Sequence, residues 1–480
     1  MKLFKLGLLL AGIIASITLI SGCVGHKPPP PIIHSDNYTA ETRKDQQAIP
    51  PADRVLDFKE AIRIALTNNP DYKQKHLAIV TAWATFYSKL AGYSPTLSAS
   101  FGGNQAQMSA MASSSPGSTA AFSNVGTTWA NSLNGSWNVF KGFQTTFDTL
   151  SARSSALSAE ELDRDYRRQL IYSVTQAYNN ILLARAKTQI DLSNEAFQLQ
   201  QLKDSQLKYN AGASSLADLL NFKINATNAR DSVVTDTAAY KVYRFVLAAL
   251  MGLTTADLPE ETNFPAIKVA ADAEYSLAIE FYLDLAIAQR PDLKAAKLNL
   301  DALKYTLYSS WGAFAPTVDL TMDYGYSRAS NGGNGNWGNS NASPRGQDLL
   351  YNYGFTVGWD IWKGGTRIAA VRKAQATLDS KEEELMKTWI TVVQQVRSAY
   401  TNLVANEKHR MLLEKVMQMT QQRRDLIREE YNAGNCDITT LNEAQNLLVQ
   451  AELGHVTSVI NVANSRAQLN EVCGTNNVLN

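Results

Sequence analysis

The side chains best suited to chemistry are few in this chain and are not grouped. It has three cysteines and five histidines among 480 residues, and the histidines share no common helix face that could bind a metal ion. No glycine-rich phosphate loop occurs. The formal net charge is +1 without a block of basic residues, so a nucleic-acid partner is not indicated. We therefore expect no enzyme active site, no metal and no cofactor.

One cysteine does stand in a pattern with a known chemistry. A short basic segment precedes an apolar run from Leu6 to Ile20, which is too short for a typical membrane span and predicts a signal peptide over residues 1–22. Ser21-Gly22 before Cys23 resembles the bacterial lipobox, so we predict a covalent lipid on the Cys23 thiol. Ordinary cleavage that leaves a free thiol is the alternative. Val24, where an aspartate would retain many lipoproteins in the inner membrane, favours the outer membrane.

The other two cysteines are predicted to remain unpaired with each other. Cys436 and Cys473 lie at the two ends of one predicted helix, Asp437 to Cys473. A helix of about 38 residues would separate them by about 55 Å, far beyond the reach of a disulfide.

Alternating apolar and polar residues predict four strands in two pairs. The clearest is 351–362, where Tyr351, Tyr353, Phe355 and Val357 share one face, as in a half-wetted strand. The others are expected at about 96–107, 129–140 and 317–327. Strands of 10 to 12 residues can cross an outer membrane when tilted. The segments Asn104–Thr128 and Arg328–Asp348, rich in Ser, Ala, Asn and Gly, are predicted to be flexible hairpin loops.

A very long helix is predicted after each strand pair, at Gln144–Asn210 and Thr366–Asn432. No proline interrupts either, and each would be about 100 Å long. Apolar residues recur at steps of four and three, as in a coiled coil: Ile171, Val174, Tyr178 and Ile181 in the first helix, and Trp389, Val393, Val396, Tyr400 and Leu403 in the second. Gly212 and Gly434 follow, where a helix C-terminus favours a left-handed residue. Shorter helices, Ser214–Met251 and Asp437–Cys473, then run back.

These elements occur twice. Trp137–Gly142 matches Trp359–Gly364, and Tyr209–Gly212 matches Tyr431–Gly434, always 222 residues apart. We therefore divide the chain into a lipidated tether or extended arm at 23–53, a first repeat at 54–252, a connector at 253–274, a second repeat at 275–474 and a tail at 475–480. The arm either wraps a neighbouring subunit or is a disordered leader. Each repeat begins with a helix that a proline, Pro70 or Pro291, interrupts.

Four strands are too few to close a membrane barrel, and open strand edges are excluded from lipid because their backbone groups would be unpaired. Several chains must therefore contribute. Three chains would give twelve strands above twelve helical columns, enclosing a wide lumen. The predicted fold class is mostly α with a membrane β-barrel: a homotrimer with a twelve-stranded barrel on a long α-helical coiled-coil barrel.

The duplicated helix–strand–strand–helix unit, the Tyr-Asn-Ala-Gly turns, the strands that start after Pro95 and Pro316, and Cys23 together resemble the TolC-like outer-membrane efflux proteins, in their lipoprotein branch. This resemblance implies a homotrimeric duct in the outer membrane of a Gram-negative bacterium, in contact with its lipid and with its helices in the periplasm. It further implies a periplasmic adaptor and an inner-membrane pump as partners, and export of small molecules. Protein export by a type I secretion system is the alternative, and the exported substrate stays open.

The resemblance also implies a periplasmic tip that closes like an iris. Tyr431 keeps the family's tip tyrosine, and Asp218 keeps an aspartate six residues after the first tip glycine. Two positions depart from the pattern, Cys436 where a gate arginine can lie and Thr440 where a pore aspartate can lie.

A second acidic position of the pore has a match in Glu443, nine residues after Gly434. We expect three copies of Glu443 to form a ring of carboxylates in the narrowest part; a solvated helix face is the alternative. The turns at Gly212 and Gly434 are the expected docking points for the adaptor.

Overall fold

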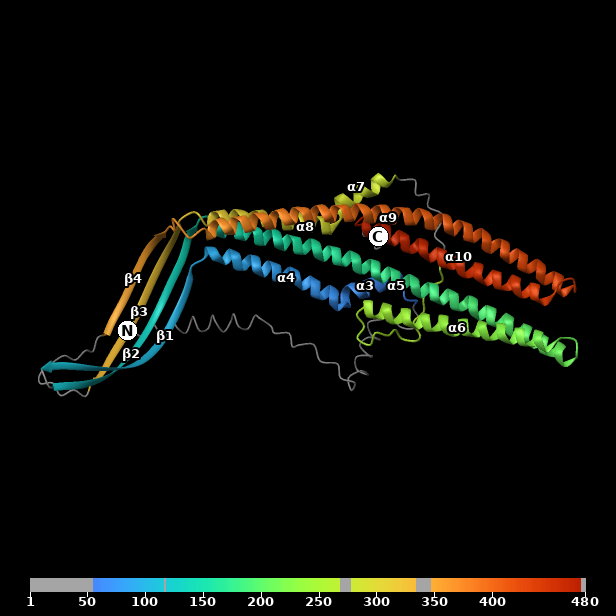
Figure 1. Cartoon of the computed structure of the whole chain (residues 1–480), viewed down its shortest axis with the longest axis horizontal. Helices are drawn as coiled ribbons and strands as arrows, with labels where there is room; N and C mark the ends of the chain where they lie inside the picture. The colour runs from blue at the N-terminus through green and yellow to red at the C-terminus, as the bar shows by residue number, and fades with distance from the viewer. Residues whose placement is uncertain (1–54, 116–117, 268–277, 334–346, 476–480) are drawn as a thin grey trace.

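The structure is a computed structural model that describes residues 55–115, 118–267, 278–333 and 347–475. The chain is elongated, with a sheet at one end and helical hairpins reaching the other (Figure 1). Within the described residues, no helix combines the length and apolar composition needed to cross a bilayer. The predicted signal peptide, Cys23 and the arm lie outside the described residues.

The helices reproduce the predicted pattern within each repeat. The two longest, α5 and α9, have 67 residues each, so each is about 100 Å long. Two short helices replace one long helix in each composite column, because α4 and α6 both pack along α5 (Figure 1). The helices are α3 Phe58–Asn68, α4 Pro70–Leu90, the short 3₁₀ helix η2 Ala91–Tyr93, α5 Gln144–Asn210, α6 Leu216–Leu250, α7 Ile279–Gln289, α8 Pro291–Gly312, α9 Thr366–Asn432 and α10 Ile438–Val472.

The predicted helix breaks hold the ends of the returning helices. Asn69, between α3 and α4, accepts a hydrogen bond from the Tyr72 N–H and donates one from Nδ2 to the Leu250 carbonyl at 2.9 Å. In the second repeat, Arg290 donates from Nη1 to the Val472 carbonyl at 3.2 Å. Both carbonyls are at a helix C-terminus that lacks its own donors. Each break therefore caps the helix that returns from the far tip.

The strands form one antiparallel sheet in the order β1-β2-β3-β4. The strands are β1 Thr96–Ser115, β2 Ser118–Lys141, β3 Thr317–Gly333 and β4 Gln347–Gly358. The central pair joins the two repeats, with Trp137 opposite Leu320 and Gly135 opposite Met322. Within the described residues, β1 and β4 each pair on one side only. The sheet therefore has two open edges in a single chain.

The predicted loop at Asn104–Thr128 is wrong. The β1–β2 ladder continues through it, pairing Asn104 with Thr128 and Gln105 with Thr127. Its Ser, Ala and Gly residues suggest a loop by composition, but each strand supplies the other with backbone hydrogen bonds, which depend little on side-chain size. In the second repeat β3 extends to Gly333, so the start of the predicted loop at Arg328–Asp348 is also strand, and residues 334–346 lie outside the described residues.

The last predicted strand is shorter than expected. β4 ends at Gly358, whereas the alternation suggests a strand through Trp362. The Trp359 indole Nε1 donates to the Phe314 carbonyl at 3.0 Å, and Asp360 forms an ion pair with Lys363 at 2.8 Å. These two interactions bend the chain toward α9 instead of continuing the ladder.

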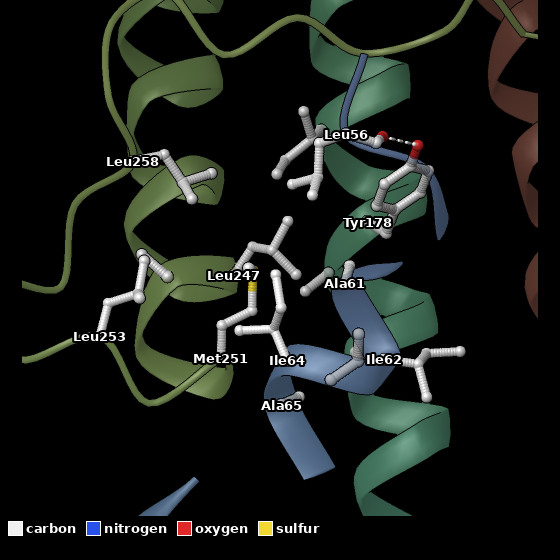
Figure 2. Packing of buried hydrophobic residues seen from close by; sticks show 14 of the residues in the cluster. Leu56, Ala61, Ile62, Ile64, Ala65, Tyr178, Leu247, Met251, Leu253 and Leu258 are labelled. Carbon is white, nitrogen blue, oxygen red and sulfur yellow. Dashed lines mark hydrogen bonds between the residues drawn. The ribbon is translucent and has the colours of Figure 1, made fainter. Parts of the chain in front are cut away.

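The main apolar core lies at the level of the helix breaks. In the first repeat it joins α3, α5, α6 and the connector, and Figure 2 shows Leu56, Tyr178, Leu247 and Leu258 meeting there. The Tyr178 hydroxyl donates to the Leu56 carbonyl at 2.8 Å, so its buried polar atom has a partner. A second cluster joins α7, α9 and α10 around Val396 and Leu403. Each repeat thus has its own core at mid-length.

Candidate functional site

The sheet has one apolar and one polar face. Phe355 lies opposite Leu320, and Tyr353 opposite Met322, and all four side chains are exposed in a single chain. On the other face Asn138 donates from Nδ2 to Asp319 at 2.6 Å, and pairs of hydroxyls join β1 to β2. An apolar outer face and a polar inner face are what a barrel strand needs between lipid and an aqueous lumen.

Two tryptophans fasten the sheet to the helices in the same way. The Trp137 indole Nε1 donates to the Tyr93 carbonyl at 2.8 Å, and Trp359 makes the equivalent bond to the Phe314 carbonyl. Each carbonyl belongs to the segment between a short helix and the proline that starts a strand. The sheet is therefore held at a repeated, defined angle to the helices that carry the channel inward.

The far tips are closed by glycine turns. Gly212 has φ +73° and Gly434 φ +78°, which only glycine adopts at little cost. The N–H of Ala213 donates to the Lys208 carbonyl, and that of Asn435 to the Glu430 carbonyl, at 2.8 and 2.9 Å. These bonds satisfy carbonyls at the ends of α5 and α9. The predicted turns at Gly212 and Gly434 are therefore rigid, identical points on two neighbouring hairpins.

Asp218 stands in a helix cap. Its carboxylate accepts from the Ser215 hydroxyl at 2.7 Å and backbone N–H at 3.2 Å, and its own N–H donates to Ser215 Oγ, which forms a capping box at the start of α6. The Ser215 hydrogen bonds lower the pKa of Asp218. In α10 the capping carboxylate is Asp437, whose Oδ1 accepts from the Ile438 N–H at 2.7 Å. Thr440, the counterpart of Asp218, therefore needs no charge for capping.

Tyr431 connects the two hairpins. Its hydroxyl accepts a hydrogen bond from Lys208 Nζ at 3.0 Å, and the ammonium lies 5.4 Å from the ring centroid. This hydrogen bond raises the pKa of Lys208. The two residues end α5 and α9 beside a polar cleft of about 270 Å³ that Asp218 and Asp437 also line. The contact can hold the tips of both repeats together and can be broken without unfolding either helix.

The remaining tip residues do not gather into one cluster. Glu443 is exposed on α10, whereas its neighbours Asn442 and Ala444 are buried, so the expected carboxylate ring stays a prediction. Cys436 donates its thiol to the Ile427 carbonyl within the same hairpin, at 3.5 Å. Thr440 is half-buried. Of the predicted tip side chains, Tyr431 alone contacts the other repeat through a described hydrogen bond.

A buried ionic cluster joins the repeats at mid-length. Arg168 of α5 contacts Asp165 and, across the repeats, Glu471 of α10, each at 2.7 Å, and Arg290 pairs with Asp292 at 2.6 Å. Burial raises the pKa of Glu471. Burial also acts to raise the pKa of Asp292, but its hydrogen bond and charge interaction with Arg290 outweigh this, and the pKa lies below its ordinary value. Removing either arginine would leave a buried carboxylate unpaired.

Sequence reasoning missed Lys208, Arg168 and Glu471. The signal for Lys208 was its place directly before the Tyr209–Gly212 turn, since a cation in the last helical turn suits the helix dipole. For Arg168 and Glu471 the signal was negative: their counterparts 222 residues away, Ile390 and Ala249, are apolar.

The geometry is that of a wall segment of a channel: a lipid-facing sheet, long paired helices and two linked tips. The sequence profile of the outer membrane efflux proteins matches residues 61–253 and 282–475, which is most of the chain. The chain belongs to the outer membrane efflux protein family. This family consists of outer-membrane channel proteins, so the expectations of a TolC-like outer-membrane efflux protein that is not an enzyme, with its helical part in the periplasm, are confirmed.

Individual relatives are distant. Outer membrane protein TolC of Escherichia coli K12 is 22% identical over 341 residues, covering 67% of this chain and 66% of TolC, just under two thirds of that relative. Alkaline protease secretion protein AprF of Pseudomonas aeruginosa is 23% identical, covering 52% of this chain and 49% of AprF. The solved Campylobacter jejuni CmeC outer membrane channel superposes with a TM-score of 0.71 at 18% identity, covering 87% of this chain and 85% of CmeC. The efflux-channel fold is therefore shared nearly end to end.

Proposed function

We propose that three copies of this chain form the outer-membrane exit duct of a tripartite efflux system, which carries small molecules from the periplasm to the exterior. The observation that carries the proposal is the four-stranded sheet with two open edges and one apolar face, continuous with helices of 67 residues. An unpaired edge is too costly in lipid, so neighbouring chains must cover β1 and β4. Twelve strands would close the barrel.

The partners would be a periplasmic adaptor and an inner-membrane pump. Two supports are the paired glycine turns at Gly212 and Gly434, which present equivalent rigid points to a docking protein, and the Lys208–Tyr431 bond, which can release the tips. An adaptor that binds the turns could stabilise an open arrangement by separating these two residues. Three copies of Glu443 would then line the passage and favour cations over anions.

A lipid on Cys23 belongs to the same proposal. Its support is the sequence pattern at Cys23, a cysteine after small residues and a signal-like apolar run. One lipidation site would add to the membrane affinity of the barrel itself. Mass spectrometry of the mature N-terminus should find residues 1–22 removed and a diacylated cysteine. An unmodified cysteine, or cleavage elsewhere, would refute this part alone.

The alternative function is protein export in a type I secretion system. Similarity to AprF, which is named for the secretion of alkaline protease, favours it. The small-molecule proposal rests on the lipobox pattern and on the fold shared with efflux channels such as CmeC.

Complementation in cells tests the proposal. A strain that lacks its own exit channel would receive this chain together with the adaptor and pump encoded beside its gene. We expect lower accumulation of a fluorescent dye, with the effect lost in a control that carries a disabled pump. Dye accumulation that stays high, with secretion of a type I substrate restored instead, would replace small-molecule efflux by protein secretion.

A further inference from the structure

We propose that the contact between neighbouring chains copies the contact between the two repeats inside one chain, with an apolar lock in place of the buried ion pair. The internal contact is α5 against α8 and α10. Its copy would place α9 of one chain against α4 and α6 of the next. The inference rests on the trimeric duct proposed above and specifies which residues meet.

Serines in matching positions give the first support. Ser158 on α5 is buried, and its Oγ donates to the Ala295 carbonyl of α8 at 2.9 Å. Its counterpart 222 residues later is also serine, Ser380 on α9, and it is exposed in a single chain. The position that matches Ala295 is Gln74 on α4. Ser380 therefore has the donor for the same bond, and the Gln74 carbonyl of a second chain would be the acceptor.

The short helices show the same difference one face at a time. Leu220 on α6 is 49% exposed, whereas its counterpart Asn442 on α10 is 7% exposed. Ile224, one turn along, is exposed, and its counterpart Asn446 is exposed too. The face of α10 that meets α5 is thus the face of α6 that carries an uncovered leucine. A neighbouring α9 should cover Leu220 and leave Ile224 in solvent.

An apolar groove on α9 identifies the centre of this contact. Trp389, Ile390 and Val393 line a groove of about 400 Å³. At the matching place on α5, Arg168 and Ile171 are packed against α10, which leaves a gap of about 20 Å³. The groove is therefore open because its partner is not in the same chain.

The occupant follows from the same correspondence. The α10 residues that fill the place on α5 include Ala467 and Glu471, and their counterparts on α6 are Phe245 and Ala249. Phe245 is 45% exposed and large enough to fill the wider groove. The exchange is paired, because Arg168–Glu471 at 2.7 Å becomes Ile390 facing Ala249, so both charges disappear together. No charge would be buried without a partner.

The strands supply a register. Inside the chain β2 and β3 pair Gly135 with Met322. Moving both to their counterparts places Val357 of β4 opposite Phe101 of β1 in the next chain. Both side chains are exposed in a single chain. A shift by two residues would keep the apolar faces aligned but place Val357 opposite Ala99 instead.

Cysteine cross-linking tests the register in the intact membrane protein. In a Cys436→Ser background, Val357→Cys with Phe101→Cys should give disulfide-linked oligomers under oxidation, because directly opposite Cβ atoms are about 5 Å apart. Val357→Cys with Ala99→Cys is the shifted control and should link far less. Preferential linking through position 99, or no linking in a particle that is still a trimer, would overturn the proposed contact. A particle that is no trimer would overturn the duct proposal as well.

Subunit dilution tests the groove. Phe245→Ala should lower trimer content by roughly tenfold at limiting concentration, as expected for emptying a large apolar contact, whereas Ile224→Ala should leave it unchanged. Ile390→Arg and Ala249→Glu should each weaken the trimer, and together they should recover most of the loss by rebuilding the internal Arg168–Glu471 pair between chains. Additive losses in the double variant, or equal effects of Phe245→Ala and Ile224→Ala, would overturn the assignment.

Discussion

The helices α5 and α9 are the same length and share one register, yet their surroundings differ. Buried residues occur along α5 from Thr149 to Ser205, whereas none lies between residues 411 and 431 of α9. α5 has neighbours from both repeats, α6 and α10 among them, whereas α9 has neighbours from its own repeat and only a glancing contribution from others. A repeated sequence is thus buried or exposed according to whether its partner belongs to the same chain.

The chemistry of the two helices differs in the same sense. At mid-length α5 carries Arg168 in a buried ionic cluster, and α9 carries exposed Ile390 and Trp389. Burial of apolar surface contributes about 25 cal/mol per Å², while a buried ion pair roughly breaks even after desolvation. An apolar surface is therefore the better driving force where contact must form between separate chains.

The largest effect should come from breaking the contact inside the chain. Arg168→Ala would leave the buried Asp165 and Glu471 carboxylates without their cation and cost about 3 to 5 kcal/mol. We expect a sharp loss of folded protein and of thermal stability in detergent. Arg164→Ala, one turn earlier, removes an exposed partner of Glu161 and should cost under about 1 kcal/mol. Similar losses in both variants would contradict the importance of the cluster.

A moderate effect is expected at the tips, where α5 ends with Lys208 and α9 has Glu430 in the matching position. Lys208→Ala removes the bond to Tyr431 and should shift the tips toward the open arrangement by about 1 kcal/mol, roughly fivefold in population. Single-channel recordings in planar bilayers should show higher conductance or longer open times. Lys203→Ala, another exposed lysine of α5, is the control and should not change either. Identical recordings for both would remove Lys208 from the gate.

The short helices allow a similar comparison for ion selectivity. Glu443 on α10 has Asn221 as its counterpart on α6, and both are exposed. If these positions line the passage, Glu443→Gln should lower the permeability ratio of potassium over chloride and weaken block by divalent cations. Asn221→Asp should raise the same ratio by adding a ring of charge. An unchanged ratio in the Glu443 variant would place that residue off the pore.

The smallest effect concerns a carboxyl on α5 whose counterpart on α9 is Leu413. Burial, with a hydrogen bond and charge interaction from Asp236, raises the pKa of Asp191 to about 6, against the opposing charge of Lys187. The folded state therefore binds this proton more tightly than the unfolded state, and stability falls as pH rises from about 4 to about 6. Asp191→Asn should raise the melting temperature by a few degrees at most at pH 7.5 and leave it nearly unchanged at pH 4. Asp231→Asn, at an exposed site of α6, is the control; a gain at pH 4 as large as that at pH 7.5 would contradict the assignment.

Much of this fold could be predicted from local patterns. The long helices begin and end at the predicted residues because proline, glycine and the apolar period all act locally. Ile171, Val174, Tyr178 and Ile181 are buried, as their spacing predicts. On α9, Val396 and Leu403 are buried, while Trp389 is exposed. Periodicity indicates which face of a helix is apolar, but it does not indicate which chain covers that face.

Other features depend on contacts that no local pattern contains. The extension of β1 and β2 through Ser- and Ala-rich sequence requires the facing strand. The early end of β4 depends on Trp359 reaching the Phe314 carbonyl, 45 residues away. At the tips, Asp218 matches the family pattern by position, but Ser215 makes it a helix cap. The contact between Lys208 and Tyr431 joins residues 223 apart, and only the packing of the two repeats brings them together.

The central claim is that a single chain is an incomplete wall and that three chains complete it. Native mass spectrometry of the full-length protein, extracted in mild detergent, measures this directly. We predict a particle of three chains with no folded monomer at working concentration, because isolated β1 and β4 edges and the α9 groove would be left uncovered. A stable, folded monomer or a dimer as the main species would contradict the account.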